Sequence, residues 1–240
     1  RRGIDQQKDQ SYFLFATTPE ELDYLRFPLG AMTKDETREL AIKYELSVSD
    51  KPDSQDICFV PNGRYGDVVR RLRPGAITPG VIRHLDGRIL GKHLGVIDYT
   101  IGQRRGLGIG GRKDEGEDNT PLYVVAIDAD AHEVIVGPQH ALACRDVYLD
   151  EVNWLVPSLM DKRDESAQGI EVFVKLRNTA PASPAKLFLN SDRSAHLVLE
   201  KAEYGIATGQ AGVIYDGSDA SLMLGGGWIS SAPISAALAV

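Results

Sequence analysis

The sequence predicts an α+β fold that is mostly β. Capped helical patterns occur only in the first sixty residues, and short strand patterns follow from about residue 75 to residue 231. Glycine and proline clusters separate these strands at short intervals, a rhythm typical of a small barrel or sandwich. We therefore expect a helical start followed by a β-rich remainder.

Two capping boxes mark the expected helices. In Thr18-Pro19-Glu20-Glu21, threonine is placed to cap, proline takes the first helical position and glutamate the third. Thr33-Lys34-Asp35-Glu36 repeats the box and leads into a stretch, 36–44, with apolar residues at helical spacing. Both helices are interpreted as scaffold.

The strand region contains two hairpin patterns. Asp86-Gly87 is a turn signal inside Val81–Leu90, and residues 122–128 and 133–137 form the second pair. The prolines of Ala180–Pro184 predict an edge or loop. Four further strands are expected, at 171–176, 185–189, 196–199 and 211–215.

Composition limits the functional classes. The net charge of −7 argues against a protein covered in basic residues for non-specific nucleic-acid binding. No apolar run is long enough to span a bilayer, and no signal peptide is visible. The only cysteines, Cys58 and Cys144, form no CxxC pair and are typical of a reducing, cytoplasmic setting. The histidines show no metal-ligand spacing, so no metal site is expected.

Cys58 has two interpretations. It lies in Asp53–Val60, between a polar, acidic lead-in and the apolar neighbours Ile57 and Phe59. A cysteine in such apolar surroundings is commonly a small buried hydrophobe. At the junction of a loop and a strand it could instead face a cleft, where thiolate chemistry becomes possible. Cys144, at an expected strand entry, is interpreted as structural.

Local basic clusters stand out against the acidic background. Lys8-Asp9-Gln10 precedes an apolar run, and its side chains could bind phosphate, sugar or base edges or simply face solvent. The same two interpretations hold for the arginine-rich stretches, because glycines between the cations allow close approach of a phosphate backbone. These stretches contain Arg64, Arg70, Arg71 and Arg73, then Arg104, Arg105, Arg112 and Lys113. The glycines of Gly106–Gly111 lack the Lys-Ser/Thr ending of a triphosphate loop and predict a bend instead.

Several segments, in order, resemble the bacterial tRNA-specific 2-thiouridylases. Their order and spacing run through almost the whole chain, to about Ile229. The segments are Lys8–Leu14, Asp53–Phe59, Tyr99–Gly111, Leu122–Val125, Val174–Arg177, Gly209-Gln210 and Leu224–Gly227.

The resemblance implies a reaction and a set of site residues. The family uses ATP to adenylate the C2 oxygen of the wobble uridine and then replaces that oxygen with sulfur from a cysteine persulfide. Cys58 matches the persulfide-carrying cysteine, loaded by a sulfur-donor protein, and a disulfide bond belongs to the same chemistry. The positions implied to contact tRNA are Lys8, Asp9, Gln10, Arg177, Asn178 and Gln210, together with Arg104 and Arg105. Asn178 departs from the aromatic residue that some members carry there.

The resemblance also implies three domains. Residues 1–63 would be the end of an α/β catalytic domain of ATP-pyrophosphatase type, 64–142 a central β domain and 143–232 a C-terminal antiparallel β-barrel that binds tRNA. No Ser-Gly-Gly-x-Asp-Ser loop and no cysteine precede Cys58. We therefore expect a fragment without the N-terminal ATP site, unable to bind ATP or to act alone.

Two other functions remain open from the sequence. The first is a non-catalytic RNA-binding module in which Cys58 is a core residue. The second is a rhodanese-like sulfurtransferase that acts without RNA, which leaves the β-rich C-terminal half unexplained.

Overall fold

The computed structural model describes residues 1–47, 49, 78–109, 120–162, 168–190 and 193–232. Two compact units account for these residues, and each is described by itself. The first contains residues 1–53, 145–202 and 207–233, and the second contains 54–144, 203–206 and 234–240, with the gaps just given. The N-terminal segment therefore groups with the C-terminal strands, although about a hundred residues separate them in the sequence.

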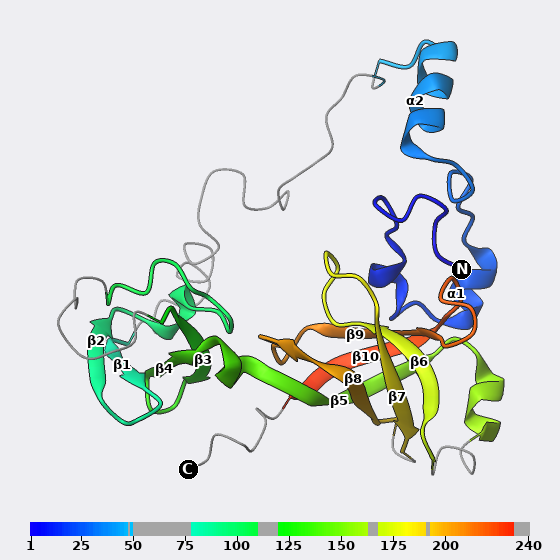
Figure 1. The fold of residues 1–240 in the computed structure, drawn as a ribbon. Helices are drawn as coiled ribbons and strands as arrows, with labels where there is room; N and C mark the ends of the chain where they lie inside the picture. The colour runs from blue at the N-terminus through cyan, green and yellow to red at the C-terminus, as the bar shows by residue number, and fades with distance from the viewer. Residues whose placement is uncertain (48, 50–77, 110–119, 163–167, 191–192, 233–240) are drawn as a thin grey trace. The chain divides into compact units, whose positions relative to one another are not determined.

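A closed six-stranded barrel forms the centre of the first unit (Figure 1). Its strand order is β10-β5-β8-β7-β6-β9, and the β10–β5, β10–β9, β9–β6, β6–β7 and β7–β8 pairs are antiparallel. The strands are β5 (Ala143–Trp154), β6 (Ile170–Lys175), β7 (Ser183–Leu189), β8 (Ala195–Tyr204), β9 (Ala211–Asp216) and β10 (Met223–Ser231). The mostly β fold with a C-terminal antiparallel barrel is thus confirmed.

The helices of the first unit are short. Both expected capping boxes are formed: Thr18 caps α1 (Pro19–Tyr24) and Thr33 caps α2 (Lys34–Lys43), and each glutamate at the third position bonds back to its cap. Short 3₁₀ helices are η1 (Ser11–Leu14) and η5 (Pro157–Lys162). The helical interpretation of the first sixty residues was too broad, because turns occupy most of the described positions between these elements.

The second unit contains a four-stranded sheet of order β2-β1-β4-β3. The turn at Gly87 joins β1 (Gly80–His84) to β2 (Ile89–His93), and β3 (Leu122–Asp128) pairs antiparallel with β4 (Glu133–Pro138), so both predicted hairpins are confirmed. The two hairpins join through β1 and β4, which run parallel. Short 3₁₀ turns, η3 (Val96–Asp98) and η4 (Gln139–Leu142), complete the unit.

The proline expectation was partly wrong. Pro184 is the second residue of β7 and pairs with Phe173 of β6, inside a barrel that is closed. A proline is tolerated there because it stands at the start of the strand, where the missing N–H removes little of the ladder. The expected break therefore falls before β7 instead of at a free sheet edge.

Candidate functional site

The predicted site residues divide between the two units and the part of the chain that is not described. Arg104 and Arg105 belong to the second unit. Cys58 lies outside the described residues, as do Arg64, Arg70, Arg71, Arg73, Arg112 and Lys113. The remaining positions all belong to the first unit and are Lys8, Asp9, Gln10, Arg177, Asn178 and Gln210.

The N-terminal segment covers the outside of the barrel over β6, β9 and β10. Side chains of β9 alternate in direction, so Gly212 and Ile214 face one side and Ala211, Val213 and Tyr215 the other. The second set is buried in one cluster with Tyr12 and Phe15, and the whole strand is consequently buried on both faces. We call this contact, between residues 1–17 and the outer face of β6, β9 and β10, the seam.

Hydrogen bonds and one close approach fix the seam. The Tyr12 hydroxyl donates to the Ala211 carbonyl at 2.9 Å, and Asn153 Nδ2 donates to the carbonyls of Phe15 and Thr17 at 2.8 and 2.9 Å. A Cβ atom at Gly226 would stand 2.8 Å from the Gly212 carbonyl oxygen and 3.0 Å from Phe15 Cβ. Glycine at 226 therefore allows Phe15 to reach the barrel.

Three of the predicted segments meet at one end of the barrel because of this packing. β6 ends at Lys175, which pairs with Val213 near the start of β9, so Arg177 and Gln210 flank neighbouring strand ends. Tyr12 lies against the same end through Ala211 and Lys175. Lys8, Gln10, Arg177 and Asn178 are exposed. The N-terminal segment is more than a hundred residues from the other two segments in the sequence, and the fold packs it against the same barrel.

Asp9 lies below that surface and organises the segment. Its side chain is 1% exposed. One carboxylate oxygen accepts from the backbone N–H groups of Gly3 and Ser11, both at 3.1 Å, and the other accepts from Arg2 Nε at 2.8 Å and Ser11 Oγ at 3.0 Å. Burial would raise the pKa of Asp9, but the hydrogen bonds from Arg2, Ser11 and Gly3 together hold it below its usual value.

Gln210 is a half-buried residue with a buried side-chain acceptor. The residue is half-buried, and within the described residues its Oε1 atom has no hydrogen-bond partner. Its backbone joins the barrel, since the Ile229 N–H donates to the Gln210 carbonyl at 2.8 Å. An amide held in this way can rotate to bond an incoming polar group.

Lys175 belongs to the same surface, and sequence reasoning missed it. Only 5% of the residue is exposed, and its Nζ lies 5.9 Å from the centre of the Tyr12 ring. Burial lowers the pKa of Lys175, nearby Arg2 lowers it further, and Asp9 opposes this change. Strand alternation places Lys175 on the outer face with Phe173, so a sequence reader expects a solvated lysine. The N-terminal segment, remote in sequence, is what buries it.

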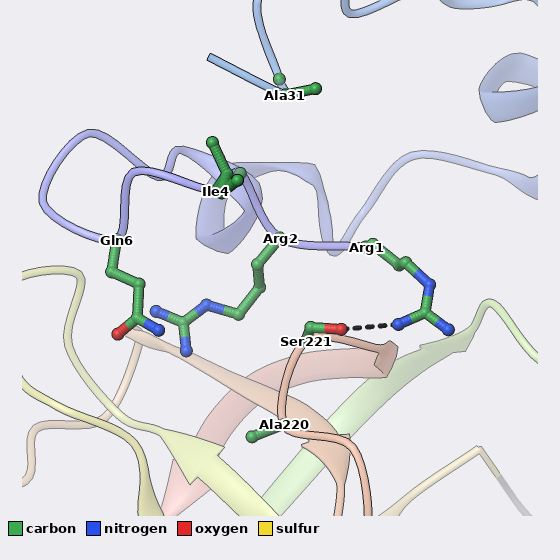
Figure 2. A pocket seen from close by; sticks show the side chains of 9 residues that line it. Arg1, Arg2, Ile4, Gln6, Ala31, Ala220 and Ser221 are labelled. Carbon is green, nitrogen blue, oxygen red and sulfur yellow. Dashed lines mark hydrogen bonds between the residues drawn. The ribbon is translucent and has the colours of Figure 1, made fainter. Parts of the chain in front are cut away.

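A cavity of about 460 Å³ lies beside the seam (Figure 2). Figure 2 shows the guanidinium of Arg2 and the amide of Gln6 pointing into the same space, and Arg1 Nη1 donating to Ser221 Oγ, at 2.7 Å. Arg1 also pairs with Asp219, and both of these side chains are substantially exposed. The residues that line the cavity are Arg1, Arg2, Gly3, Ile4, Gln6, Gly30, Ala31, Ala220 and Ser221.

The second unit presents Arg104 and Arg105 on a tight turn. Gln103 braces this turn, because its Oε1 accepts from the Thr100 N–H and its Nε2 donates to the Arg105 carbonyl, both at 3.0 Å. The Gly102 N–H donates to the Val124 carbonyl at 2.8 Å, which ties the turn to β3. The arginine side chains themselves are exposed. The bend expected at Gly106–Gly111 is confirmed at Gly106 and Gly108, which have positive φ, whereas Gly110 and Gly111 lie outside the described residues.

Two further expectations from the sequence concern Cys144 and membrane-spanning segments. Cys144 is 3% exposed at the start of β5 and forms no disulfide within the described residues, consistent with a structural role. In the same part of the chain, no helix has both the length and the apolar character needed to cross a membrane.

Three family profiles match the chain one after another. They are the tRNA methyl transferase HUP domain at residues 1–62, the tRNA methyl transferase PRC-barrel domain at 67–138 and the aminomethyltransferase β-barrel domain at 144–229. The third match covers most of the observed barrel.

Curated relatives agree over nearly the full chain. The tRNA-specific 2-thiouridylase MnmA of Rhodospirillum centenum is 56% identical over 239 residues, which cover 99% of this chain and 58% of the relative. The proteins of the same name from Ruegeria sp. and Maricaulis maris are 55% and 53% identical, over 94% and 96% of this chain and 56% and 54% of their own lengths. The chain thus spans little more than half the length of these relatives, and over that length it belongs to the tRNA-specific 2-thiouridylase family.

Proposed function

We propose that this chain takes part in the 2-thiolation of the wobble uridine of tRNA. The observation that carries the proposal is that Arg177-Asn178 and Gln210 flank neighbouring strand ends of the barrel, where Tyr12 of the segment that contains Lys8–Gln10 also bonds to Ala211. Family membership supports the same reaction, because the relatives are named for it. The exposed side chains supply cations and amides, which bind phosphate, ribose and base edges.

The roles within this surface differ. Lys8 and Arg177 supply charge for phosphate groups, and Gln10, Asn178 and Gln210 supply amide hydrogen bonds. Asp9 acts as a positioning residue, because its acceptor positions are already filled by Arg2, Gly3 and Ser11. Arg104 and Arg105 add a second, exposed contact to the RNA backbone.

Cys58 is proposed to carry the sulfur. A sulfur-donor protein would transfer a sulfur atom to the Cys58 thiolate, giving a persulfide. ATP would adenylate the C2 oxygen of the uridine, and the terminal persulfide sulfur would attack C2 while AMP leaves with the oxygen. A thiolate of a second cysteine would then attack the Cys58 sulfur, releasing the thiolated base and leaving a disulfide. The sequence has no Ser-Gly-Gly-x-Asp-Ser loop, so no residue of this chain is assigned to ATP.

Sulfur loading tests this role directly. The 240-residue chain is incubated with a persulfide-loaded donor protein, and each cysteine-containing peptide is analysed by mass spectrometry. We expect one additional sulfur atom on Cys58, no loading of Cys58→Ser, and unchanged loading of the matched control Cys144→Ser, because Cys144 is buried.

The alternative function makes a different prediction for the same experiment. A non-catalytic RNA-binding module would bind tRNA in a mobility-shift assay but leave Cys58 unmodified. Binding of tRNA without sulfur on Cys58 would therefore favour that module and contradict the sulfur-carrying role.

A further inference from the structure

Trp228 is a large aromatic residue that the fold leaves open to solvent on the outside of the barrel. It lies near the end of β10 and is 45% exposed, whereas its neighbour Ile229 points inward and is 1% exposed. Tryptophan provides a large contact area when a ligand or partner covers it. One exposed apolar residue is by itself ordinary, so the surroundings of the ring decide whether it has a use.

The seam holds the ring of Trp228 in place. Its centroid lies 5.2 Å from that of Phe15, and the two ring planes stand at 84°, the edge-to-face arrangement of a stable aromatic pair. Phe15 is 6% exposed and packs closely against Gly226, so this support is itself fixed. A ring on a fixed support loses little conformational entropy when a ligand covers it. The indole is therefore preorganised for binding.

Trp228 lies beside one of the proposed tRNA contacts. In the β9–β10 ladder it pairs with Ala211, the residue after Gln210. The adjoining Ile229 N–H donates to the Gln210 carbonyl at 2.8 Å. Arg177, an exposed cation, follows the end of β6, which pairs with the same part of β9. An aromatic ring, an amide and a cation thus occupy neighbouring strand ends, and these are the groups that bind unpaired RNA.

A carboxylate next to Trp228 decides which part of an RNA fits the ring. On its other side Trp228 pairs with Asp150 of β5, and directly paired residues present their side chains on the same face of a sheet. Asp150 is exposed. Its charge repels a phosphate group, whereas its oxygens accept hydrogen bonds from the amino groups of bases. A base is therefore the fitting ligand at this position, and a phosphate is not.

We propose that Trp228 is a stacking platform for an unpaired base of the tRNA, with Asp150 beside it to accept from an amino group of that base. Because the ligand is RNA, this assignment rests on the proposed function. Stacking requires a base whose π face is free, so the platform takes looped or single-stranded RNA and not a paired stem. It adds an apolar contact to a surface otherwise made of cations and amides.

Fluorescence reports stacking on Trp228 directly. The sequence has two tryptophans, so Trp154→Phe leaves Trp228 as the only indole. Addition of tRNA to this variant should quench its emission, because a base in contact with an indole quenches it. Trp228→Phe, which retains only Trp154, is the matched control and should show no loss other than absorption of light by the RNA. Binding of tRNA in a mobility-shift assay without quenching of Trp228 would overturn the platform and leave tRNA binding intact.

Two substitutions of Trp228 separate stacking from packing. Leucine can still pack against Phe15 but has no ring, so in Trp228→Leu the affinity for tRNA should fall about tenfold, the loss of one stacked base. Trp228→Phe should retain most of the affinity. The slope of log affinity against log salt should stay the same in both, because no phosphate contact is lost. Tyr24→Ala, which removes an 85% exposed ring from α1, is the control and should bind as the wild type does.

Short oligonucleotides test the base and keep this inference separate from the proposed function. Oligo(C) should quench Trp228 more than oligo(U), because uracil has no amino group for Asp150, and Asp150→Ala should remove the difference. Equal affinity of the wild type and Trp228→Leu for tRNA would overturn the platform. A smaller salt slope in Trp228→Leu would assign the contact to phosphate and overturn the base as ligand. If oligo(C) quenches Trp228 while Cys58 accepts no sulfur, the platform stands and the proposed function fails.

Discussion

The seam and the turn at Gly102–Gly108 both present cations, but they do so in opposite ways. In the seam, Arg2 and Lys175 are desolvated and fixed by a buried carboxylate and two aromatic rings. In the turn, the backbone is braced by Gln103 while Arg104 and Arg105 extend into solvent. Exposed charges are screened by salt and attract any polyanion, whereas buried ones act at short range and in one geometry. The comparison separates exposed cations, which can attract a polyanion, from buried cations, which are held in one geometry by the fold.

The largest expected effect comes from Asp9→Asn, which would break the seam from within. The amide cannot accept all four hydrogen bonds, and Arg2 loses its buried counter-ion. We expect the free energy of unfolding of the first unit to fall by about 3 kcal/mol, as for other broken buried pairs, in a urea titration at pH 7. Glu20→Gln, on the exposed first turn of α1, is the control and should be nearly neutral.

The pH dependence of stability provides a second readout of Asp9. Because the folded-state pKa of Asp9 lies below its unfolded value, its contribution is present above the unfolded pKa and is lost as pH falls through the folded pKa. The difference in stability between wild type and Asp9→Asn should therefore shrink as pH falls below about 4. A difference that stays constant down to the acid transition would mean that the carboxylate charge does not stabilise the seam.

Gly226→Ala would strain the seam from the barrel side with a smaller effect. The added methyl group meets the Gly212 carbonyl and Phe15, so the N-terminal segment must shift outward. Overpacking of this kind costs about 2 kcal/mol, and thermal unfolding would report it. Ala16→Gly is the control for general loosening of the segment. Gly87→Ala would not serve as a control, because the positive φ of Gly87 would strain an alanine. If Gly226→Ala left tRNA affinity and stability unchanged, the close approach of Phe15 would be unnecessary.

Arg104→Glu with Arg105→Glu should have the smallest effect on stability and a clear effect on binding. Both side chains are exposed, so the free energy of unfolding should change by no more than about 0.5 kcal/mol. Affinity for tRNA should fall and its salt dependence should flatten, as measured by filter binding at several salt concentrations. Unchanged salt dependence would contradict the proposed contact between the turn and RNA.

Local sequence patterns predicted the fold well where local interactions decide it. The Thr18 and Thr33 boxes each satisfy backbone donors within one helical turn, and the Asp86-Gly87 turn needs only a positive φ at glycine. The parallel contact of β1 with β4 was not predicted, because strand patterns contain no information on which strands become neighbours. The closure of the barrel by β9 and β10 was not predicted for the same reason.

The candidate site was predictable only in part. The segments around Lys8, Arg177 and Gln210 were identified by their resemblance to a family, and their exposure or burial depends on how the N-terminal segment packs. From its sequence context Asp9 is expected to be a polar loop residue, but its side chain is buried. Lys175 is expected to be a solvated strand residue, but Tyr12 covers it. For Lys175 no local signal carries that information, since Tyr12 is more than 150 positions away in the sequence.

The seam also sets an order of events when the protein is made. Ser11 contacts Tyr215, 204 residues later, and Tyr12 contacts Ala211, 199 residues later. Contacts so distant in sequence form slowly, because a long loop must close before they stabilise anything. On the ribosome Tyr12 and Phe15 therefore stay uncovered until β9 and β10 have been synthesised. The N-terminal segment therefore completes its packing only after two strands that lie about 200 residues later have been made.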